Sequence, residues 1–276
     1  MTVFNTTNCT LGEGPLWHPE RGELLWFDIV GKRLHSASRQ WDFPEMVSAA
    51  GWVSRDELLI ASESRLFRFN LETAAEQTLC ALEADNDATR SNDGRADPMG
   101  GFWIGTMAKE KGKGAGAFYR YYKGELRKLW DGITVTNAQC FAPDGRTAYF
   151  SDTPTQQVMR VALDADGWPN ATPEVALDFT VQGWHPDGAV TDAAGNLWIA
   201  FWGRGCVEGY SPAGEKLATF DFPCPQTTCP AFGDADFSRL YCTSAARDLT
   251  DGNPANGQTF SVDTKFTGRA EARVHL

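Results

Sequence analysis

A short apolar strand that follows a turn rich in Gly and Asp recurs six times along the chain. The central residues of these strands are spaced by 33, 44, 46, 49 and 43 positions, and they are Trp26, Leu59, Trp103, Tyr149, Trp198 and Tyr241. A period of this length holds about four short strands, the content of one blade of a β-propeller. Because the strands are short and the period is long, a propeller is favoured over a solenoid. We therefore expect an all-β fold, a six-bladed β-propeller that forms one domain over residues 1–276.

Further strands flank the repeated ones. An apolar strand precedes the turn, as at residues 14–17 and 188–191, and another follows the central strand, as at residues 66–69. Strong helical periodicity is absent. Residues 3–4 and 260–262 are candidates to pair with each other, which would close the ring and remove open sheet edges.

The charge balance restricts the possible partners. The chain carries 25 Lys and Arg residues against 36 Asp and Glu residues, a formal net charge of −11. This excess of acid argues against nucleic acid or an anionic membrane as a partner and is compatible with cation binding.

No secretory leader and no apolar run of membrane-spanning length is visible, so we expect a cytoplasmic protein with reduced cysteines. No apolar stripe demands an assembly, which favours a monomer or a weak homo-oligomer.

Four polar residues lie just before the first apolar strand of their repeats, and they are Glu13, Asn92, Asn137 and Asp187. A propeller brings the innermost strands of all its blades to one axial channel, so these side chains should converge there. They offer only oxygen donors, two carboxylates and two amides, which suit a hard cation. Calcium, magnesium and manganese are therefore candidates, and zinc can also bind through oxygen ligands.

A purely structural interpretation exists for each of these segments. Glu13-Gly14-Pro15, Asn92-Asp93-Gly94 and Pro186-Asp187-Gly188 are common turn sequences, and we expect residues 92–94 to form a tight turn. The position within the repeat separates the two interpretations, because residues between two strands belong to hairpin turns. This criterion assigns three acidic residues to turns: Asp97, Asp144 and Asp192.

Four longer motifs occur in order along the chain: Leu11-Gly12-Glu13-Gly14-Pro15-Leu16-Trp17; Arg90-x-Asn92-Asp93-Gly94-x-x-Asp97-Pro98-x-Gly100-x-Phe102-Trp103-x-Gly105-Thr106-Met107; Asn137 with Ser151-Asp152-Thr153; and Pro186-Asp187-Gly188 with Gly195-Asn196-Leu197-Trp198. With these motifs, the stretch from Cys9 to Arg247 resembles the sugar-lactone lactonase family, which includes gluconolactonase, L-arabinolactonase and regucalcin. The chain departs from the family pattern at Ser91 and at residues 138–140, two changes that could reshape the pocket.

The resemblance implies a six-bladed propeller with one divalent cation in its axial channel, calcium being the first candidate. It assigns metal binding to Glu13, Asn137 and Asp187, and substrate contacts to Arg90, Asn92 and Glu110. It also implies a small-molecule substrate, a sugar lactone, which is hydrolysed to the aldonic acid. The cation would polarise the lactone carbonyl and lower the pKa of bound water, and Asp187 would act as general base.

Two other functions remain open at this point. The same metal site could hydrolyse a phosphotriester, as in related organophosphate-hydrolysing propellers. Alternatively, the protein could be a non-catalytic calcium-binding or interaction propeller, because fold alone does not decide function. A serine hydrolase is disfavoured, since no G-x-S-x-G motif occurs. Neither the ring size of the lactone nor its sugar follows from the sequence.

Overall fold

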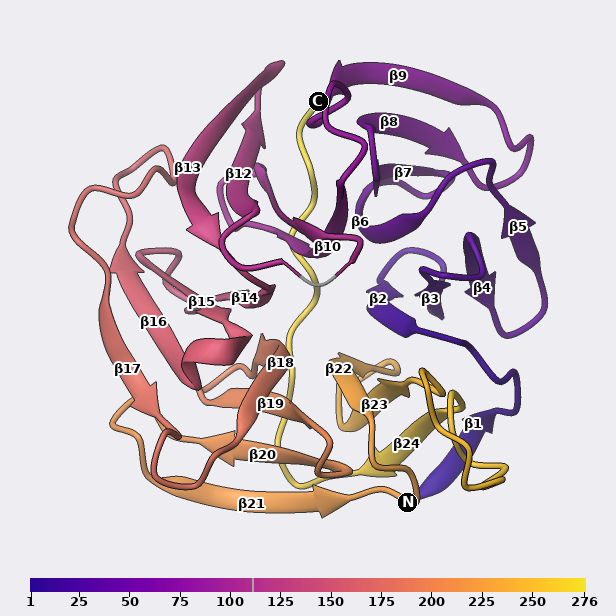
Figure 1. The fold of residues 1–276 in the computed structure, drawn as a ribbon, viewed down its shortest axis with the longest axis vertical. Helices are drawn as coiled ribbons and strands as arrows, with labels where there is room; N and C mark the ends of the chain where they lie inside the picture. The colour runs from indigo at the N-terminus through magenta and orange to yellow at the C-terminus, as the bar shows by residue number, and fades with distance from the viewer. Residues whose placement is uncertain (111) are drawn as a thin grey trace.

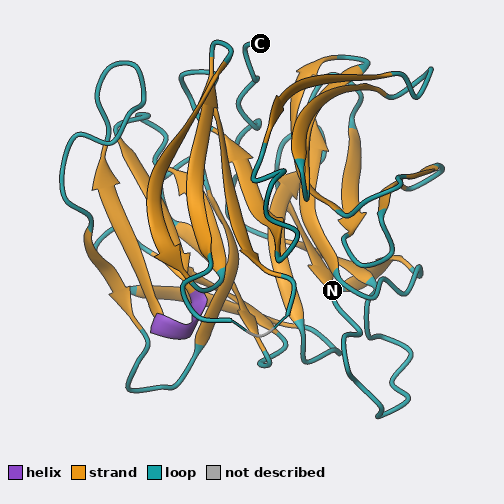
Figure 2. Cartoon of the chain, turned by 45° about the horizontal axis from the view of Figure 1, so that its top comes forward, coloured by secondary structure: helices purple, strands orange, loops and turns teal. Residues whose placement is uncertain are grey.

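The computed structural model describes residues 1–110 and 112–276, which form six four-stranded antiparallel sheets arranged as blades around a central axis (Figure 1). The predicted six-bladed β-propeller is therefore confirmed. Loops connect the strands at both ends of the blades, and a short 3₁₀ helix, η1 (Thr153–Thr155), is the single helical element of the described part (Figure 2). In the described residues, no helix has the length and apolar character needed to cross a membrane.

Five blades use four strands that are consecutive in the sequence and run from the axis outward. Their bounds are, for blade 1, β2 (Gly12–His18), β3 (Glu23–Asp28), β4 (Arg33–Ser36), β5 (Gln40–Asp42); for blade 2, β6 (Val47–Ser54), β7 (Glu57–Ser62), β8 (Arg65–Asn70), β9 (Glu76–Ala81); for blade 3, β10 (Thr89–Ala96), β11 (Phe102–Ala108), β12 (Gly116–Tyr122), β13 (Glu125–Ile133); for blade 4, β14 (Thr136–Phe141), β15 (Thr147–Asp152), β16 (Gln157–Ala162), β17 (Glu174–Asp178); and for blade 5, β18 (His185–Thr191), β19 (Leu197–Trp202), β20 (Cys206–Tyr210), β21 (Lys216–Asp221).

The sixth blade joins the two ends of the chain. Its strands, from the axis outward, are β22 (Thr227–Gly233), β23 (Arg239–Ser244), β24 (Thr259–Asp263) and β1 (Thr2–Asn5). Thr2 pairs with Ser261 and Val3 with Phe260, as the sequence predicts. The N-terminal strand thus closes the ring, and no blade depends on a neighbouring molecule to complete its sheet.

The contact of Phe4 with the closing blade leads to a stability prediction. Its ring packs edge-on against Trp26, with centroids 6.1 Å apart, and against Tyr241 at 5.0 Å. Because each aromatic pair contributes about 0.5–1.5 kcal/mol, we expect Phe4→Ala to lower the free energy of unfolding by about 1–3 kcal/mol. Urea unfolding measures this change. Val3→Ala is the matched control, because that side chain is 46% exposed; an equal loss in both variants would contradict the aromatic explanation.

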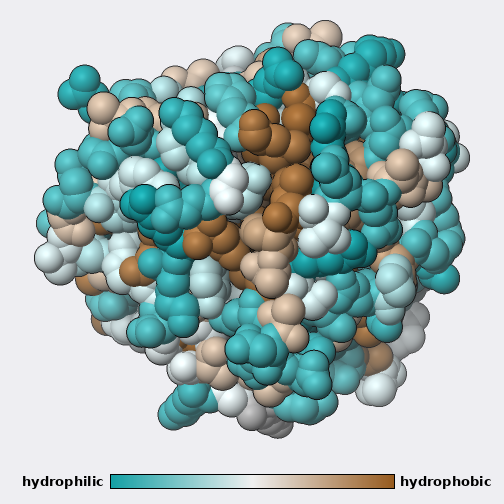
Figure 3. Space-filling model, turned by 90° about the horizontal axis from the view of Figure 1, so that it is seen from above, coloured by the Kyte–Doolittle hydropathy of each residue, from teal (hydrophilic) through white to brown (hydrophobic). Residues whose placement is uncertain are grey.

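The repeated aromatic and aliphatic residues form the core between the blades. All six central residues lie on the second strand of their blade, and all are buried. Their turns support them, since the carboxylate of Asp192 accepts hydrogen bonds from the Asn196 amide at 2.9 Å and from Trp198 Nε1 at 3.0 Å. Asp97 accepts one from Arg120 Nε at 2.6 Å. The turn assignments of Asp97 and Asp192 are therefore confirmed. On the face of the molecule that Figure 3 shows, the surface is largely hydrophilic, and apolar side chains gather in a narrow band.

Residues 92–94 do not form the tight turn that the sequence suggests, because they lie inside β10. Ser91 pairs with Thr106 and Gly94 with Ile104, so three steps along β10 oppose two along β11. This extra residue is a β-bulge, which bends a strand and re-aims its side chains. Turns and bulges both favour Gly, Asn and Asp, because these residues tolerate backbone conformations outside the β region. The tripeptide alone therefore does not distinguish a turn from a bulge.

The same irregularity occurs in four more innermost strands, between Glu13 and Leu16 in β2, between Asn137 and Cys140 in β14, between Pro186 and Ala189 in β18, and between Thr227 and Pro230 in β22. The candidate residues thus lie within the innermost strands and not before them. At Gly14, φ is 53° and a Cβ atom would lie 2.4 Å from the Ser48 carbonyl oxygen, so only glycine fits. Ala138 adopts a φ of 57°, a left-handed conformation that favours glycine, and this strained backbone follows Asn137 directly.

Candidate functional site

A cavity of about 210 Å³ lies at the end of the axial channel where the innermost strands begin. It is lined by Leu11, Glu13, Arg90, Asn92, Met107, Val135, Asn137, Thr153, Asp187, Trp202 and Arg247. Five of the six candidate residues therefore converge on one cavity, although they come from four blades. The bulges explain this convergence, because each one turns a polar side chain out of the sheet and toward the axis.

Two buried carboxylates face this cavity, and each is 5% exposed. Burial raises the pKa of Glu13 to about 8, and the nearby Asp93 carboxylate acts in the same direction. The Gly14 amide, which donates to Glu13 Oε2 at 3.0 Å, opposes this shift. Burial, followed by the charge of Glu13, raises the pKa of Asp187 well above its usual value. The charge of Glu13 therefore disfavours the charge of Asp187, while the Arg90 guanidinium lowers the pKa of both carboxyl groups without offsetting their burial.

A chain of hydrogen bonds orients the two amides. Arg90 donates to Asn92 Oδ1 at 2.8 Å, and Asn92 Nδ2 donates to Asn137 Oδ1 at 3.0 Å. Asn137 Nδ2 donates to Thr153 Oγ1 at 2.8 Å, and this hydroxyl donates to the Pro186 carbonyl at 2.7 Å. The chain links blades 3, 4 and 5. It directs Asn137 Oδ1 toward Asn92, and a carbonyl oxygen can accept from a second partner as well.

Arg90 is one of the two arginines that line the cavity. Its side chain is buried, and it also donates to the Ser91 carbonyl at 2.8 Å. Burial lowers its pKa to about 10, and the nearby Arg247 guanidinium contributes to this decrease. Arg90 therefore remains protonated at neutral pH and is held in place by its neighbours, which suits a group that binds hydroxyl or carbonyl oxygens of a ligand.

Sequence reasoning missed two polar residues of the cavity, Thr153 and Arg247. Thr153 belongs to a motif that the resemblance uses, but no role could be derived for it without its contacts with Asn137. Arg247 follows β23 on a loop and has no motif of its own. Its backbone is held by Gln226, whose Oε1 accepts from the Arg247 amide at 3.0 Å and whose Nε2 donates to the Arg247 carbonyl at 2.9 Å. This clamp keeps Arg247 at the cavity.

Glu110 does not line the central cavity. It is exposed and lies on an adjoining open depression of about 580 Å³, together with Lys109 and Lys113. The two spaces share Met107, Val135 and Arg247, so Glu110 lies beside the candidate site. A substrate that extends beyond the central cavity would reach it.

The donor set of the cavity fits a hard divalent cation. Glu13 and Asp187 bring two negative charges, and Asn137 adds an amide oxygen; such oxygen ligands suit calcium, magnesium or manganese. The residues that line the cavity include no Cys or His. In residues 1–110 and 112–276, no group of three or more His, Cys, Asp or Glu side chains is placed to hold a metal by itself. A cation here would therefore need amide oxygens or water in addition to the two carboxylates.

Comparisons with known proteins point to one family. Residues 11–246 match the model of the SMP-30/Gluconolactonase/LRE-like region. A Rhizobium meliloti (strain 1021) protein assigned as a sugar lactone lactonase is 39% identical, with 96% of this chain and 94% of that protein covered. A pentonolactonase of Haloferax volcanii is 33% identical, with 99% and 98% covered. The crystal structure of regucalcin, a calcium-binding protein from Agrobacterium tumefaciens, has a TM-score of 0.96 and 40% identity, with 100% and 97% covered.

Proposed function

Because this chain belongs to the SMP-30/gluconolactonase/LRE-like family, we propose that its central cavity binds one divalent cation and opens a sugar lactone to the aldonic acid. The chain is a lactonase, as its relatives indicate. We place the activity in this cavity because two buried carboxylates, two amides and one arginine, which come from four blades, converge on it. Calcium is the first candidate, since regucalcin, at 40% identity, is a calcium-binding protein.

Glu13, Asn137 and Asp187 are the proposed ligands of the cation. A cation held by these residues would polarise a carbonyl group and lower the pKa of bound water. It would also add positive charge beside the two buried carboxylates, whose pKa values burial raises despite the nearby Arg90. Asn92 supports this arrangement, because its Nδ2 donates to Asn137 Oδ1 at 3.0 Å.

Asp187 is the proposed general base. A water oxygen attacks the lactone carbonyl carbon while the Asp187 carboxylate takes a proton from that water. The bond between the carbonyl carbon and the ring oxygen then breaks, and Asp187 returns its proton to the ring oxygen, which leaves as a hydroxyl. Arg90 and Asn92 orient the sugar through its hydroxyl groups, which places the carbonyl for attack. The products are the aldonate and one proton.

The walls of the cavity define how the sugar lies. Leu11, Met107, Val135 and Trp202 supply apolar surface in addition to the polar groups. A sugar lactone has apolar C–H surfaces and polar edges, so this division suits it. Glu110 is the proposed contact for a substrate group that extends into the adjoining depression.

A panel of pentono- and hexonolactones tests the proposal. We expect acid release that stops when a chelator removes the cation and returns when calcium, manganese, magnesium or zinc is added singly. The cation that restores the highest kcat/KM identifies the preferred metal. A rate of lactone hydrolysis that the chelator leaves unchanged would contradict the cation site. Hydrolysis of a phosphotriester without any lactone turnover would favour the phosphotriesterase alternative.

A further inference from the structure

The C-terminal segment, residues 264–276, crosses the end of the axial channel that lies opposite the candidate site. In Figure 1 it is the yellow trace through the middle of the ring. It is bonded to five of the six blades, through contacts with Trp52, Gly100, Phe141, Ala193 and Phe237. Each of these residues belongs to an innermost strand or to the loop that follows one, and Val274 is fully buried. The segment therefore acts as a strap over the channel.

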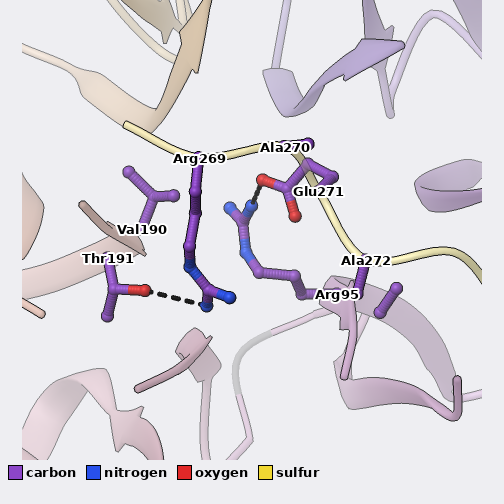
Figure 4. A pocket seen from close by; sticks show the side chains of 8 residues that line it. Arg95, Val190, Thr191, Arg269, Ala270, Glu271 and Ala272 are labelled. Carbon is purple, nitrogen blue, oxygen red and sulfur yellow. Dashed lines mark hydrogen bonds and ion pairs between the residues drawn. The ribbon is translucent and has the colours of Figure 1, made fainter. Parts of the chain in front are cut away.

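Arg95 connects this strap to the strands of the site. It lies in β10, is buried, and pairs with Glu271 of the strap, as Figure 4 shows. Its Nε donates to the Gln139 carbonyl of β14 at 3.0 Å, and its NH2 group donates to the Ala189 carbonyl of β18 at 3.0 Å. The Arg95 side chain thus joins the innermost strand of each of blades 3, 4 and 5.

These bonds lie close to the candidate ligands along each strand. Arg95 is three residues from Asn92, Gln139 is two from Asn137, and Ala189 is two from Asp187. A second hydrogen bond joins β10 and β14, because the backbone N–H of Gln139 donates to Asp93 Oδ2 at 3.1 Å. The distances between the three bulges therefore depend on how the Arg95 guanidinium is oriented.

Glu271 sets this orientation. Among the described residues it is the one carboxylate that forms an ion pair with Arg95, and its side chain is 10% exposed. A buried guanidinium that loses its partner carries a large desolvation cost and moves toward other acceptors. Asp93, one position from Asn92, is the buried carboxylate nearest along β10, so the loss of Glu271 would disturb the strand that carries Asn92.

We propose that Glu271 is a positioning residue for the cation site: through Arg95 it fixes the mutual spacing of β10, β14 and β18, and with it the geometry of Asn92, Asn137 and Asp187. The inference rests on the proposed cation site. It assigns to the C-terminal segment a role in ligand binding at the opposite end of the channel, in addition to its packing role.

The test compares Glu271→Ala and Glu271→Gln with Arg273→Met. Arg273 is the matched control, because its Nε donates to the Val53 carbonyl at 2.6 Å and it forms no hydrogen bond or ion pair with Arg95. Calcium affinity is measured by titration calorimetry on the substrate-free protein, well below its unfolding temperature. We expect Glu271→Ala to weaken calcium binding about 10-fold or more. Glu271→Gln should retain part of the affinity, because its amide oxygen still accepts from Arg95. Arg273→Met should lower the Tm without changing the affinity.

Wild-type affinity in a folded Glu271→Ala variant would overturn the inference, and so would an equal loss of affinity in Arg273→Met. If Glu271→Ala does not fold, the folded Glu271→Gln variant decides: a partial loss of affinity supports the inference, and wild-type affinity overturns it. A wild-type chain that binds none of calcium, magnesium, manganese and zinc would overturn the proposed cation site and the inference with it; if it binds one of the other three cations and not calcium, the same comparison is made with that cation. Normal calcium binding by wild type and both Glu271 variants would overturn only the inference.

Discussion

Asp187→Asn is expected to lower kcat for lactone hydrolysis about 10²–10⁴-fold, the range that general acid–base groups contribute. Asn has the same shape as Asp, so the bulge in β18 and the packing around it should persist. The amide cannot accept a proton from the attacking water, however, and it removes one of the two negative charges of the cavity. Steady-state kinetics on the best lactone of the panel measure the loss.

Added cation separates the two proposed roles of Asp187. If this residue is the base, saturating cation should not restore turnover in Asp187→Asn. Asp192→Asn is the matched control, because Asp192 lies in the same blade and bonds Trp198 outside the cavity. That control should lower the Tm while kcat stays near the wild-type value. A folded Asp187→Asn variant with wild-type turnover would refute the base assignment.

Glu13→Gln is expected to raise the cation concentration needed for half-maximal activity by at least about 10-fold, because carboxylate count tunes the affinity of oxygen-ligand sites. In contrast to Asp187→Asn, activity should return at saturating cation, since Glu13 is proposed only as a ligand. The Gly14 amide that bonds Glu13 can bond the Gln oxygen equally well, so the bulge in β2 should be kept.

Glu83→Gln serves as the control for this experiment. Glu83 accepts hydrogen bonds from Thr89, Thr106 and Tyr119, and it does not line the cavity. Its replacement should leave the cation requirement unchanged. If Glu13→Gln stays inactive at every cation concentration, Glu13 takes part in the chemical step and the assignment of roles is wrong.

The fold follows from the sequence because its main determinant is periodic and local. Each blade needs a second strand that is buried on both faces, and residues such as Trp26, Trp103 and Trp198 supply it. The turn before each strand is encoded by neighbouring residues. Ring closure by Val3 and Phe260 was predictable for a related reason, since unpaired strand edges at both chain ends have one obvious partner in a closed ring.

The site was predictable in part. Position within the repeat selects Glu13 and Asp187 over Asp144, and this criterion needs no tertiary contact. The nature of the local structure was not predictable, because a bulge and a turn use the same residues. Only the register of β10 against β11 reveals that residues 92–94 continue the strand.

The sequence by itself therefore determined the number of blades, the closure of the ring and the polar residues that the innermost strands bring to the axis. These features depend on the spacing at which buried apolar strands recur along the chain and on local backbone preference. The tertiary structure alone decided the hydrogen-bond chain from Arg90 to Thr153, the clamp that holds Arg247, and the strap that brings Glu271 to Arg95. Glu271 lies 176 residues from Arg95. Such contacts depend on where distant segments meet in space, and no local pattern encodes them.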